Sequence, residues 1–202
     1  MYKNCIKRII DIVVSFLGIV LLSWLFIGLC IAIKVDSKGP VFFKQKRVGK
    51  NKKYFNILKF RTMYIDTPKD MPTHLLTDPE KYITKVGRFL RKTSLDELPQ
   101  LLNIFVGHMS IIGPRPALWN QEDLLALRDE VGANDVMPGL TGWAQINGRD
   151  ELELEEKARL DREYVKNLSF IFDLKCFFGT IKSVVKQDGV VEGGVGAMKN
   201  RK

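Results

Sequence analysis

The chain has few of the residues that build disulfide frameworks and metal centres. Its 202 residues include three cysteines and two histidines. Cys5, Cys30 and Cys176 are odd in number and far apart, with no C-x-x-C pair, which argues against a disulfide framework and a thiolate zinc site. His74 and His108 are too few for a multi-histidine metal site, and we assign His108 no role. The sequence therefore fits a reducing compartment.

Negative charge is also scarce. Lysine and arginine number 32 against 23 aspartates and glutamates, which gives a net charge of +9. This excess favours anionic partners, namely nucleic acid, phosphates or an acidic membrane surface, and composition does not choose among them. The length suits one globular domain of ordinary size plus an accessory segment.

Residues 12–33 form an apolar run of 22 positions without a charge. A helix of this length spans about 33 Å, enough to cross a hydrocarbon core of about 30 Å. The run is too long for a signal-peptide core and no small-x-small cleavage site follows it. We therefore interpret it as a retained membrane anchor.

The orientation of this anchor has two alternatives. Cations flank the run on both sides, at Lys3, Lys7 and Arg8 before it and eight times between residues 34 and 53. Because cations prefer the cytoplasmic side, a helix that dips in and returns keeps both flanks inside, whereas a spanning helix exports three. The central pair Ser23–Trp24 favours a bent, re-entrant helix only weakly. Both alternatives leave the soluble part in the cytoplasm.

The soluble part predicts a helix-rich α/β fold with a small β-hairpin. Residues 41–63 alternate apolar and basic side chains around a turn at 49–51, so Lys59 and Arg61 would project from one surface of a strand. A solvated strand face explains that pair equally simply.

Helices are expected at 83–94, 98–106, 121–131, 153–168 and 170–186, separated from the hairpin by a polar loop at 66–79. The last helix fits either an interfacial position on acidic lipid or packing against the core. We divide the chain into an anchor at 1–36, a cytoplasmic domain at 37–187 and a flexible, glycine-rich tail at 188–202.

Two adjacent acids, Asp96 and Glu97, stand out in this basic chain. Ser94 followed by Glu97 matches a capping box, and acids complement the dipole of a first helical turn. Pro99 fits best as the first residue of the helix. Either register places both acids at or just before a helix N-terminus, a position that also binds phosphate well. Alone, the motif is typical of a cap.

Downstream residues favour a functional reading. Arg115 lies between Pro114 and Pro116, whose fixed φ angles hold it in a stiff segment suited to bidentate phosphate binding. Residues 138–149 combine three glycines with Trp143, Gln145, Asn147 and Arg149. Such glycines let backbone approach a ligand, while an aromatic ring and amides can bind a base. The alternative is a glycine-rich connecting loop.

The ordered motifs KFRTM, SLDELPQL, GHMSIIGPRP, PGLTGWAQINGR and LDREYVKNLSFIFDLK, after a basic hydrophobic N-terminus, resemble the bacterial sugar transferase family, the monotopic phosphoglycosyl transferases. The resemblance runs from about residue 3 to residue 185, and five motifs in order make it highly specific. The chain resembles the minimal catalytic form, without the extra transmembrane helices of larger members. The re-entrant helix of the family is commonly broken by a Ser-Pro pair, where this chain has Ser23–Trp24.

The resemblance implies transfer of a sugar 1-phosphate from a UDP-sugar to a polyprenol phosphate, usually undecaprenyl phosphate, with release of UMP. It implies Mg²⁺ as cofactor, membrane lipids as partners and a place at the cytoplasmic face of the bacterial inner membrane. By resemblance Asp96 is the nucleophile, which forms a covalent aspartyl intermediate, and Glu97 completes the catalytic dyad. Asp96 could also be a Mg²⁺ ligand. The resemblance further implies that substrate contacts come from Lys59, Arg61, Arg91, Pro114, Arg115, Gln145, Asn147 and Arg149.

Two rival functions remain at this stage. A membrane-tethered nucleic-acid-binding or adaptor protein would account for the charge, although no recognition-helix or stacking-sheet motif is present and we expect no nucleic acid as partner. An enzyme that transfers the bare sugar would release UDP in place of UMP. The identity of the sugar, the role of Glu97 and the oligomeric state are not encoded in any motif that we recognise.

Overall fold

The computed structural model describes residues 2–67, 79–148 and 152–186. It has the helix-rich α/β fold that the sequence predicted, and it contains two small sheets. The helices are α1 Lys7–Leu21, α2 Ser23–Asp36, α3 Lys85–Thr93, α4 Gln100–Val106, α5 Glu122–Glu130, α6 Trp143–Ile146, α7 Leu154–Asn167 and α8 Phe170–Lys186. The strands are β1 Phe42–Val48, β2 Tyr54–Phe60, β3 Ser110–Ile112 and β4 Gly139–Thr141. The expected tail at 188–202 and most of the expected loop at 66–79 lie outside the described residues.

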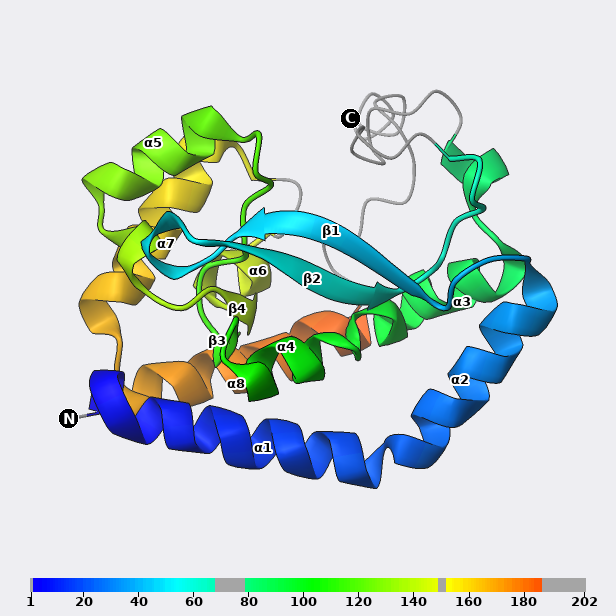
Figure 1. The fold of residues 1–202 in the computed structure, drawn as a ribbon. Helices are drawn as coiled ribbons and strands as arrows, with labels where there is room; N and C mark the ends of the chain where they lie inside the picture. Colours follow the sequence, from blue (N-terminus) through cyan, green and yellow to red (C-terminus); the bar gives the residue numbers. More distant parts are fainter. Residues whose placement is uncertain (1, 68–78, 149–151, 187–202) are drawn as a thin grey trace.

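The predicted hairpin is confirmed. β1 and β2 pair antiparallel, with Phe42 opposite Phe60 and Val48 opposite Tyr54. Asn51 and Lys52 have φ angles of 53° and 58° in the turn, a left-handed conformation that asparagine tolerates better than most residues. Figure 1 shows this hairpin crossing the middle of the molecule, with α4 along one side and α5 and α7 beyond its turn.

Sequence periodicity missed the second sheet. β3 and β4 are three residues each and pair in parallel, with Ser110 opposite Gly139 and Ile112 opposite Thr141. They belong to the segments GHMSIIGPRP and PGLTGWAQINGR, so the proposed connecting loop is in fact a strand followed by the short helix α6. Three residues are too few to show a period of two, which explains the omission.

The core is divided among four clusters around the hairpin. Leu29, Ile33, Phe60 and Leu90 join α2, β2 and α3. A second cluster joins β2 to α4 through Phe55, Ile57, Ile104 and Met109. The third contains Val48, Ala117 and Leu124, and the fourth contains Ile112, Tyr164 and Cys176. The hairpin thus contributes to three clusters, so its position fixes those of α2, α4 and α5.

The apolar run at 12–33 is bent. α1 and α2 meet at 62°, and the break lies at Leu22, one residue before the predicted pair Ser23–Trp24. Within the described part of the chain no single helix is long and apolar enough to cross a membrane, whereas this bent pair has the length and composition to do so. An uninterrupted spanning helix is therefore not what the structure has.

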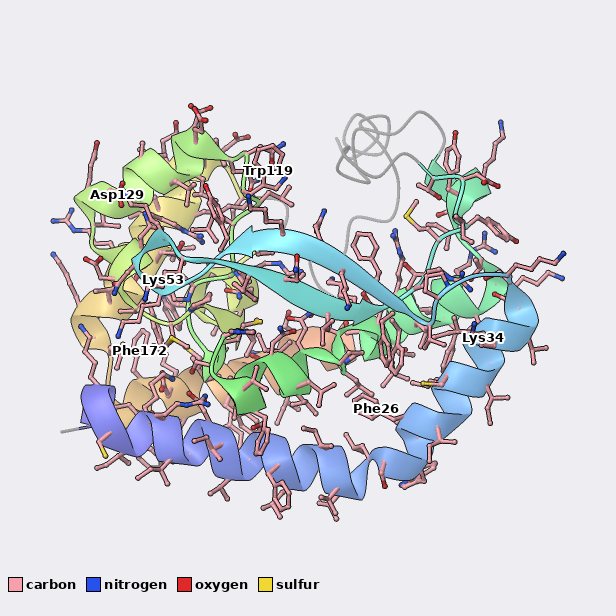
Figure 2. All side chains as sticks on the ribbon, viewed as in Figure 1. Phe26, Lys34, Lys53, Trp119, Asp129 and Phe172 are labelled. Carbon is pink, nitrogen blue, oxygen red and sulfur yellow. The ribbon has the colours of Figure 1, made fainter. Side chains whose placement is uncertain are left out.

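Helix α1 has its polar side chains buried and its apolar side chains exposed. Lys7, Asp11 and Ser15, four residues apart, are at most 8% exposed. Lys7 Nζ donates to Asp173 Oδ2 on α8 at 2.6 Å, and Asp11 Oδ1 accepts from the Ile111 backbone N–H at 2.9 Å. These polar residues therefore attach α1 to the rest of the protein, and the apolar side chains of α1 point outward (Figure 2).

Helix α8 combines the two alternatives that its sequence left open. One side packs into the core through Cys176, which is fully buried. Its other side exposes large apolar residues, namely Phe170, Ile171, Leu174, Phe177, Phe178 and Ile181. On α4, Leu102, Phe105 and Val106 are exposed as well, and the Phe105 ring lies 6.1 Å from that of Phe16 on α1. Figure 1 shows α4 and α8 alongside α1, so the exposed apolar residues belong to neighbouring helices.

Candidate active site

The two acids lie in a 3-10 turn, Leu95–Glu97, between α3 and α4. Ser94 ends α3 with a left-handed φ of 57°, and Pro99 directly precedes α4. The expected position just before a helix N-terminus is confirmed. The capping box is wrong, because the Ser94 side chain makes no cap hydrogen bond and the Glu97 carboxylate binds two cations instead.

Lys59 on β2 reaches both acids. Its Nζ lies 2.7 Å from Glu97 Oε1 and 3.5 Å from Asp96 Oδ2. The three side chains are only 13–19% exposed, so the contact is largely shielded from water. The ammonium group therefore binds Glu97 closely and Asp96 loosely.

Arg115 approaches Glu97 from the other side. Its Nη2 lies 2.9 Å from Glu97 Oε1, the oxygen that also accepts from Lys59. The prolines on either side hold this arginine, as the sequence predicted, and its target in the structure is Glu97. The side chain is 37% exposed, which leaves one side of the guanidinium open to solvent.

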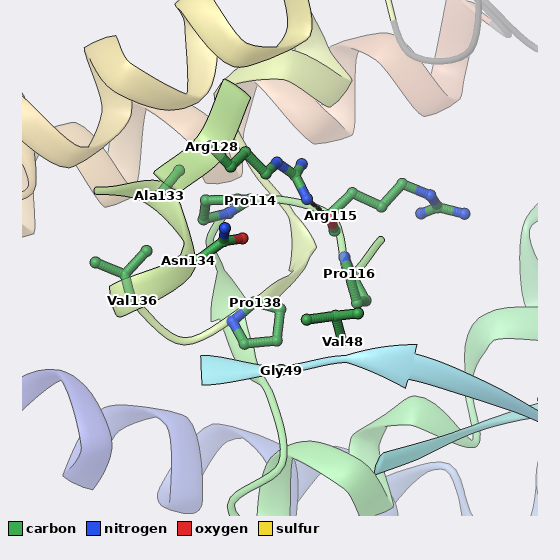
Figure 3. A pocket seen from close by; sticks show the side chains of 10 residues that line it. All are labelled: Val48, Gly49, Pro114, Arg115, Pro116, Arg128, Ala133, Asn134, Val136 and Pro138. Atoms are coloured by element: carbon green, nitrogen blue, oxygen red, sulfur yellow. Dashed lines mark hydrogen bonds between the residues drawn. The ribbon is translucent and has the colours of Figure 1, made fainter. Parts of the chain in front are cut away.

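Arg128 on α5 holds the backbone of Arg115. Its Nη1 donates to the Arg115 carbonyl at 2.9 Å (Figure 3). Its Nε donates to Asp161 Oδ2 on α7 at 2.7 Å. Arg128 and Asp161 have side chains 6% and 1% exposed. This pair was not predicted, because 33 residues separate its members and Arg128 lies outside the five motifs, although Asp161 belongs to LDREYVKNLSFIFDLK.

The pocket in Figure 3 lies on the carbonyl side of Arg115, whose guanidinium points away from it. It is lined by Val48, Gly49, Pro114, Arg115, Pro116, Arg128, Ala133, Asn134, Val136 and Pro138. It has room for about one water molecule, far less than a nucleotide-sugar needs. Pro114 lines this pocket, and its carbonyl accepts from the Gly139 N–H at 2.8 Å, so the structure gives it a packing position.

Arg91 and Arg61 have different surroundings. Arg91, in the last turn of α3, donates from Nε to Thr62 Oγ1 at 2.9 Å and is close enough to Asp96 to lower the pKa of its carboxyl group. Arg61 is 6% exposed and donates to the carbonyls of Ser37 and Lys38 at 2.8 and 2.6 Å, just beyond the end of α2.

Lys59 and Arg61, which were expected to project from one surface, therefore bind different partners. Both terminal nitrogens of Arg61 donate to the backbone of residues 33–38, and the left-handed glycine at Gly39 leaves room for them. A Cβ at Gly39 would lie 2.1 Å from Arg61 Nη1. A guanidinium next to the last carbonyls of a helix stabilises that end, and this is the position that the structure gives Arg61.

Gly139 and Gly142 of the segment 138–149 allow close backbone packing and do not line an open ligand site. A Cβ at Gly142 would lie 2.1 Å from the carbonyl oxygen of Gly113, and one at Gly139 would lie 2.1 Å from the Gly113 nitrogen. The space beside them is thus filled by the backbone just before Pro114. Glycine is required there because two backbones approach each other.

The side-chain amides of Gln145 and Asn147 in this segment have different surroundings. Gln145 on α6 is 7% exposed, and among the described residues neither its Nε2 nor its Oε1 has a hydrogen-bond partner. Asn147 is exposed and donates to the Trp143 carbonyl at 2.7 Å. Arg149 lies outside the described residues. Buried unpaired polar groups are rare, so Gln145 and the equally unpaired Nε1 of Trp143 call for a further partner.

The two acids have opposite electrostatic environments. Burial raises the pKa of the Asp96 carboxyl, Glu97 adds to this effect, and Lys59, Arg91 and Arg115 offset it only in part. Burial also acts to raise the pKa of Glu97, but Arg115 and Lys59 outweigh it and hold that pKa well below its ordinary value. Glu97 is thus the permanently ionised partner, while Asp96 is the carboxyl that takes up a proton more readily.

The acid pair also suits a divalent cation held jointly with a substrate. The described residues contain no group of three or more His, Cys, Asp or Glu side chains able to hold a metal ion. Mg²⁺, however, commonly binds one or two carboxylates together with substrate phosphates. Asp96 lies 3.5 Å from Lys59 Nζ, whereas Glu97 lies 2.7 Å from Lys59 and 2.9 Å from Arg115, so Asp96 fits such a ligand better than Glu97.

Comparison with known proteins identifies the family. A model of the family described as bacterial sugar transferase matches residues 2–187. The chain is similar to the uncharacterized sugar transferase EpsL of Bacillus subtilis, with 42% identity over 187 residues that cover 92% of this chain and 90% of the relative. It is also similar to the exopolysaccharide production protein ExoY of Sinorhizobium fredii, with 37% identity over 199 residues that cover 91% and 87% of the two chains.

A longer relative has a named reaction. The UDP-glucose:undecaprenyl-phosphate glucose-1-phosphate transferase of Escherichia coli is 40% identical over 186 residues, which cover 89% of this chain and 40% of that protein. This chain therefore spans about two fifths of the length of that relative. Because the family model matches nearly the whole chain and the relatives agree with it, the chain belongs to the bacterial sugar transferase family and is a transferase.

Proposed function

We propose that this protein transfers a sugar 1-phosphate from a UDP-sugar to undecaprenyl phosphate and releases UMP. The observation that carries the proposal is the pair of largely shielded acids among Lys59, Arg91 and Arg115, with Glu97 bound closely by Lys59 and Arg115 and with Asp96 at 3.5 Å from Lys59. The names of the Escherichia coli and Komagataeibacter xylinus relatives, both transferases that act on undecaprenyl phosphate, support the acceptor. Such a reaction would begin the assembly of a lipid-linked glycan.

Asp96 is the nucleophile in this proposal. Its carboxylate oxygen attacks the sugar-side phosphorus of the UDP-sugar, and the bond from that phosphorus to the bridging oxygen breaks, so UMP leaves with the electron pair. A phosphate oxygen of undecaprenyl phosphate then attacks the aspartyl phosphosugar and frees Asp96. An acyl phosphate retains about the transfer potential of the bond it replaces, so the reaction is divided into two moderate steps.

Glu97 holds the cations in this scheme. A single oxygen of Glu97 accepts from both Lys59 and Arg115, so its charge orients these two donors toward the neighbouring Asp96. Positioned cations stabilise the charge that develops on the phosphoryl oxygens, which is the main task of phosphoryl-transfer enzymes. The lowered pKa of Glu97 makes it a poor general base toward the acceptor, and this favours the positioning role.

Asp96, together with the diphosphate of the substrate, would hold Mg²⁺. When bound, the ion would neutralise the diphosphate and favour the ionised form of Asp96 that attack requires. In its absence burial raises the pKa of Asp96, so loss of the cation weakens the nucleophile as well as substrate binding. We therefore expect chelation of Mg²⁺ to stop UMP release.

The nucleotide is proposed to bind beside the Pro114–Pro116 segment and α6. The unpaired, buried amide of Gln145 supports this placement, because a base offers both a donor and an acceptor to such a group. Pro114, Asn147 and Arg149 remain predicted substrate contacts.

The exposed apolar side chains support a membrane position. α1 and α2 expose Phe16, Val20, Trp24 and Ile27, and α4 and α8, which lie alongside α1 in Figure 1, expose further apolar residues. Apolar surface of this extent marks a membrane or protein contact. With cations on both flanks of the bent pair, we propose a re-entrant anchor and a catalytic domain on the cytoplasmic face of the bacterial inner membrane.

The test is the product formed without acceptor. Incubated with a panel of UDP-sugars and Mg²⁺, the enzyme should release at most one UMP per chain and retain a phosphosugar on Asp96, detectable by mass spectrometry. Asp96→Asn should release none, while Asp123→Asn, an exposed acid on α5, should behave as the unmodified chain. Release of UDP would indicate transfer of the bare sugar, and full turnover by Asp96→Asn would disprove the mechanism.

A further inference from the structure

Asn103 binds the free edge of β2. β2 pairs with β1 on one side, and at its other edge the Leu58 N–H donates to Asn103 Oδ1 while Asn103 Nδ2 donates to the Asn56 carbonyl, both at 2.9 Å. The N–H of Leu58 and the carbonyl of Asn56 point to the same edge, so one side-chain amide satisfies both, as a neighbouring strand would. Asn103 is 3% exposed, and its amide is therefore fully committed to the strand.

This contact joins the same two segments as the ion pair in the candidate active site. Leu58 directly precedes Lys59, whose Nζ binds Glu97. Asn103 lies on α4, the helix that begins three residues after Glu97. A lysine side chain has four flexible torsions, so the place where its backbone is held decides which carboxylate oxygen it meets.

We propose that Asn103 is a positioning residue, which sets the register between β2 and α4 and thereby places the Lys59 ammonium on Glu97 and beside Asp96. This inference rests on the proposed function for its catalytic consequence, although the geometry itself does not. The other charges that face Asp96 come from Glu97 in its own turn, Arg91 on α3 and Arg115 after β3. None of these is held by Asn103 in the contacts above, so Lys59 is the group through which Asn103 acts.

The first measurement is a double-mutant cycle on the full chain in detergent, with UDP-glucose, Mg²⁺ and undecaprenyl phosphate as probes. Asn103→Leu should lower kcat by about 10- to 100-fold, since small misplacements of catalytic groups have effects of this size. In a Lys59→Met background the same substitution should change kcat by less than about twofold, because the lysine through which Asn103 acts is already absent. Multiplicative effects of the two substitutions would overturn the proposal.

The matched control is Tyr164→Phe. Tyr164 is also buried, and its hydroxyl makes two hydrogen bonds, to the Ile112 carbonyl and to Asp173. Asp173 lies on α8, so these bonds do not involve the acid pair. This variant should lose thermal stability with kcat unchanged. If Asn103→Leu and Tyr164→Phe lower kcat equally at equal loss of stability, Asn103 is only structural and the proposal fails.

A second readout requires no turnover. Carboxyl ¹³C NMR should show the pKa of Glu97 below its ordinary value in the unmodified chain, and a higher pKa in Asn103→Leu because Lys59 has moved away. An unchanged Glu97 pKa would refute the positioning role, whereas absence of UMP release from the unmodified chain refutes only the proposed function. Should Asn103→Leu fail to fold, Asn103→Asp, which keeps the acceptor for Leu58, should give the same shift in smaller measure.

Discussion

The ion pair Arg128–Asp161 offers a prediction in which stability and activity separate. Asp161→Asn leaves the Arg128 guanidinium, 6% exposed, without its carboxylate partner. Removal of one partner from a buried pair costs about 3–5 kcal/mol of unfolding free energy. At about 2–4 °C per kcal/mol for a chain of this size, the melting temperature should fall by about 6–20 °C. Tryptophan fluorescence during heating in detergent measures this shift.

Replacement of both partners should have a different effect. Burial raises the pKa of Asp161 in spite of the attached Arg128, so the attraction between them does not outweigh the loss of hydration. Arg128→Met with Asp161→Leu should therefore stay within about 1 kcal/mol of the unmodified chain. Activity should remain low, because the Arg115 carbonyl has lost the donor that holds it 2.9 Å away.

Two outcomes would refute this reasoning. The first is a fall of less than about 3 °C for Asp161→Asn, which is below what loss of a buried partner produces. The second is recovery of both stability and activity in the double variant, which would show that the contact with Arg115 is unimportant. The control is Glu156→Gln, which breaks the exposed pair with Arg159 on the same helix and should leave the melting temperature unchanged.

Two further predictions concern the α1–α2 anchor. Arg61→Met should lower the unfolding free energy by about 2–4 kcal/mol through loss of the bonds to Ser37 and Lys38, with the KM for a UDP-sugar unchanged in initial-rate assays. A tenfold rise in KM at unchanged stability would instead support phosphate binding by Arg61. A re-entrant anchor keeps Cys5 cytoplasmic, so a membrane-impermeant maleimide should label Cys5 in a Cys30→Ala variant only after the cells are opened. Labelling in intact spheroplasts would establish a spanning helix.

Local sequence signals predicted most of the elements correctly. α8 was expected at 170–186 and is found at Phe170–Lys186, α7 agrees within one residue at each end, and the hairpin agrees within three. These elements are long enough for a period of 3.6 or 2 to be visible along the chain. The strands β3 and β4 were missed because hydrogen bonds to each other define them, and no local pattern encodes that pairing.

The site residues show the same difference between local sequence patterns and contacts of distant residues. Asp96 and Glu97 could be selected from the sequence because their motif, and its order among the others, is local. The partners of Lys59 and Arg61 could not be predicted. Lys59 binds a carboxylate 38 positions away, and Arg61 donates to carbonyls up to 28 positions back. Side-chain alternation along a strand says that two residues share a face, but not what covers that face at each point.

The sequence by itself determined the family, the acid pair and a hydrophobic anchor with cations on both flanks, because each depends on residues close together in the chain. Only the tertiary structure decided which of the two acids is bound closely by cations. The difference between Asp96 and Glu97 arises from Lys59 and Arg115, which arrive from β2 and from the segment after β3. Adjacent carboxylates are equivalent in a sequence, and their environments differ only once burial and distant charges are brought around them.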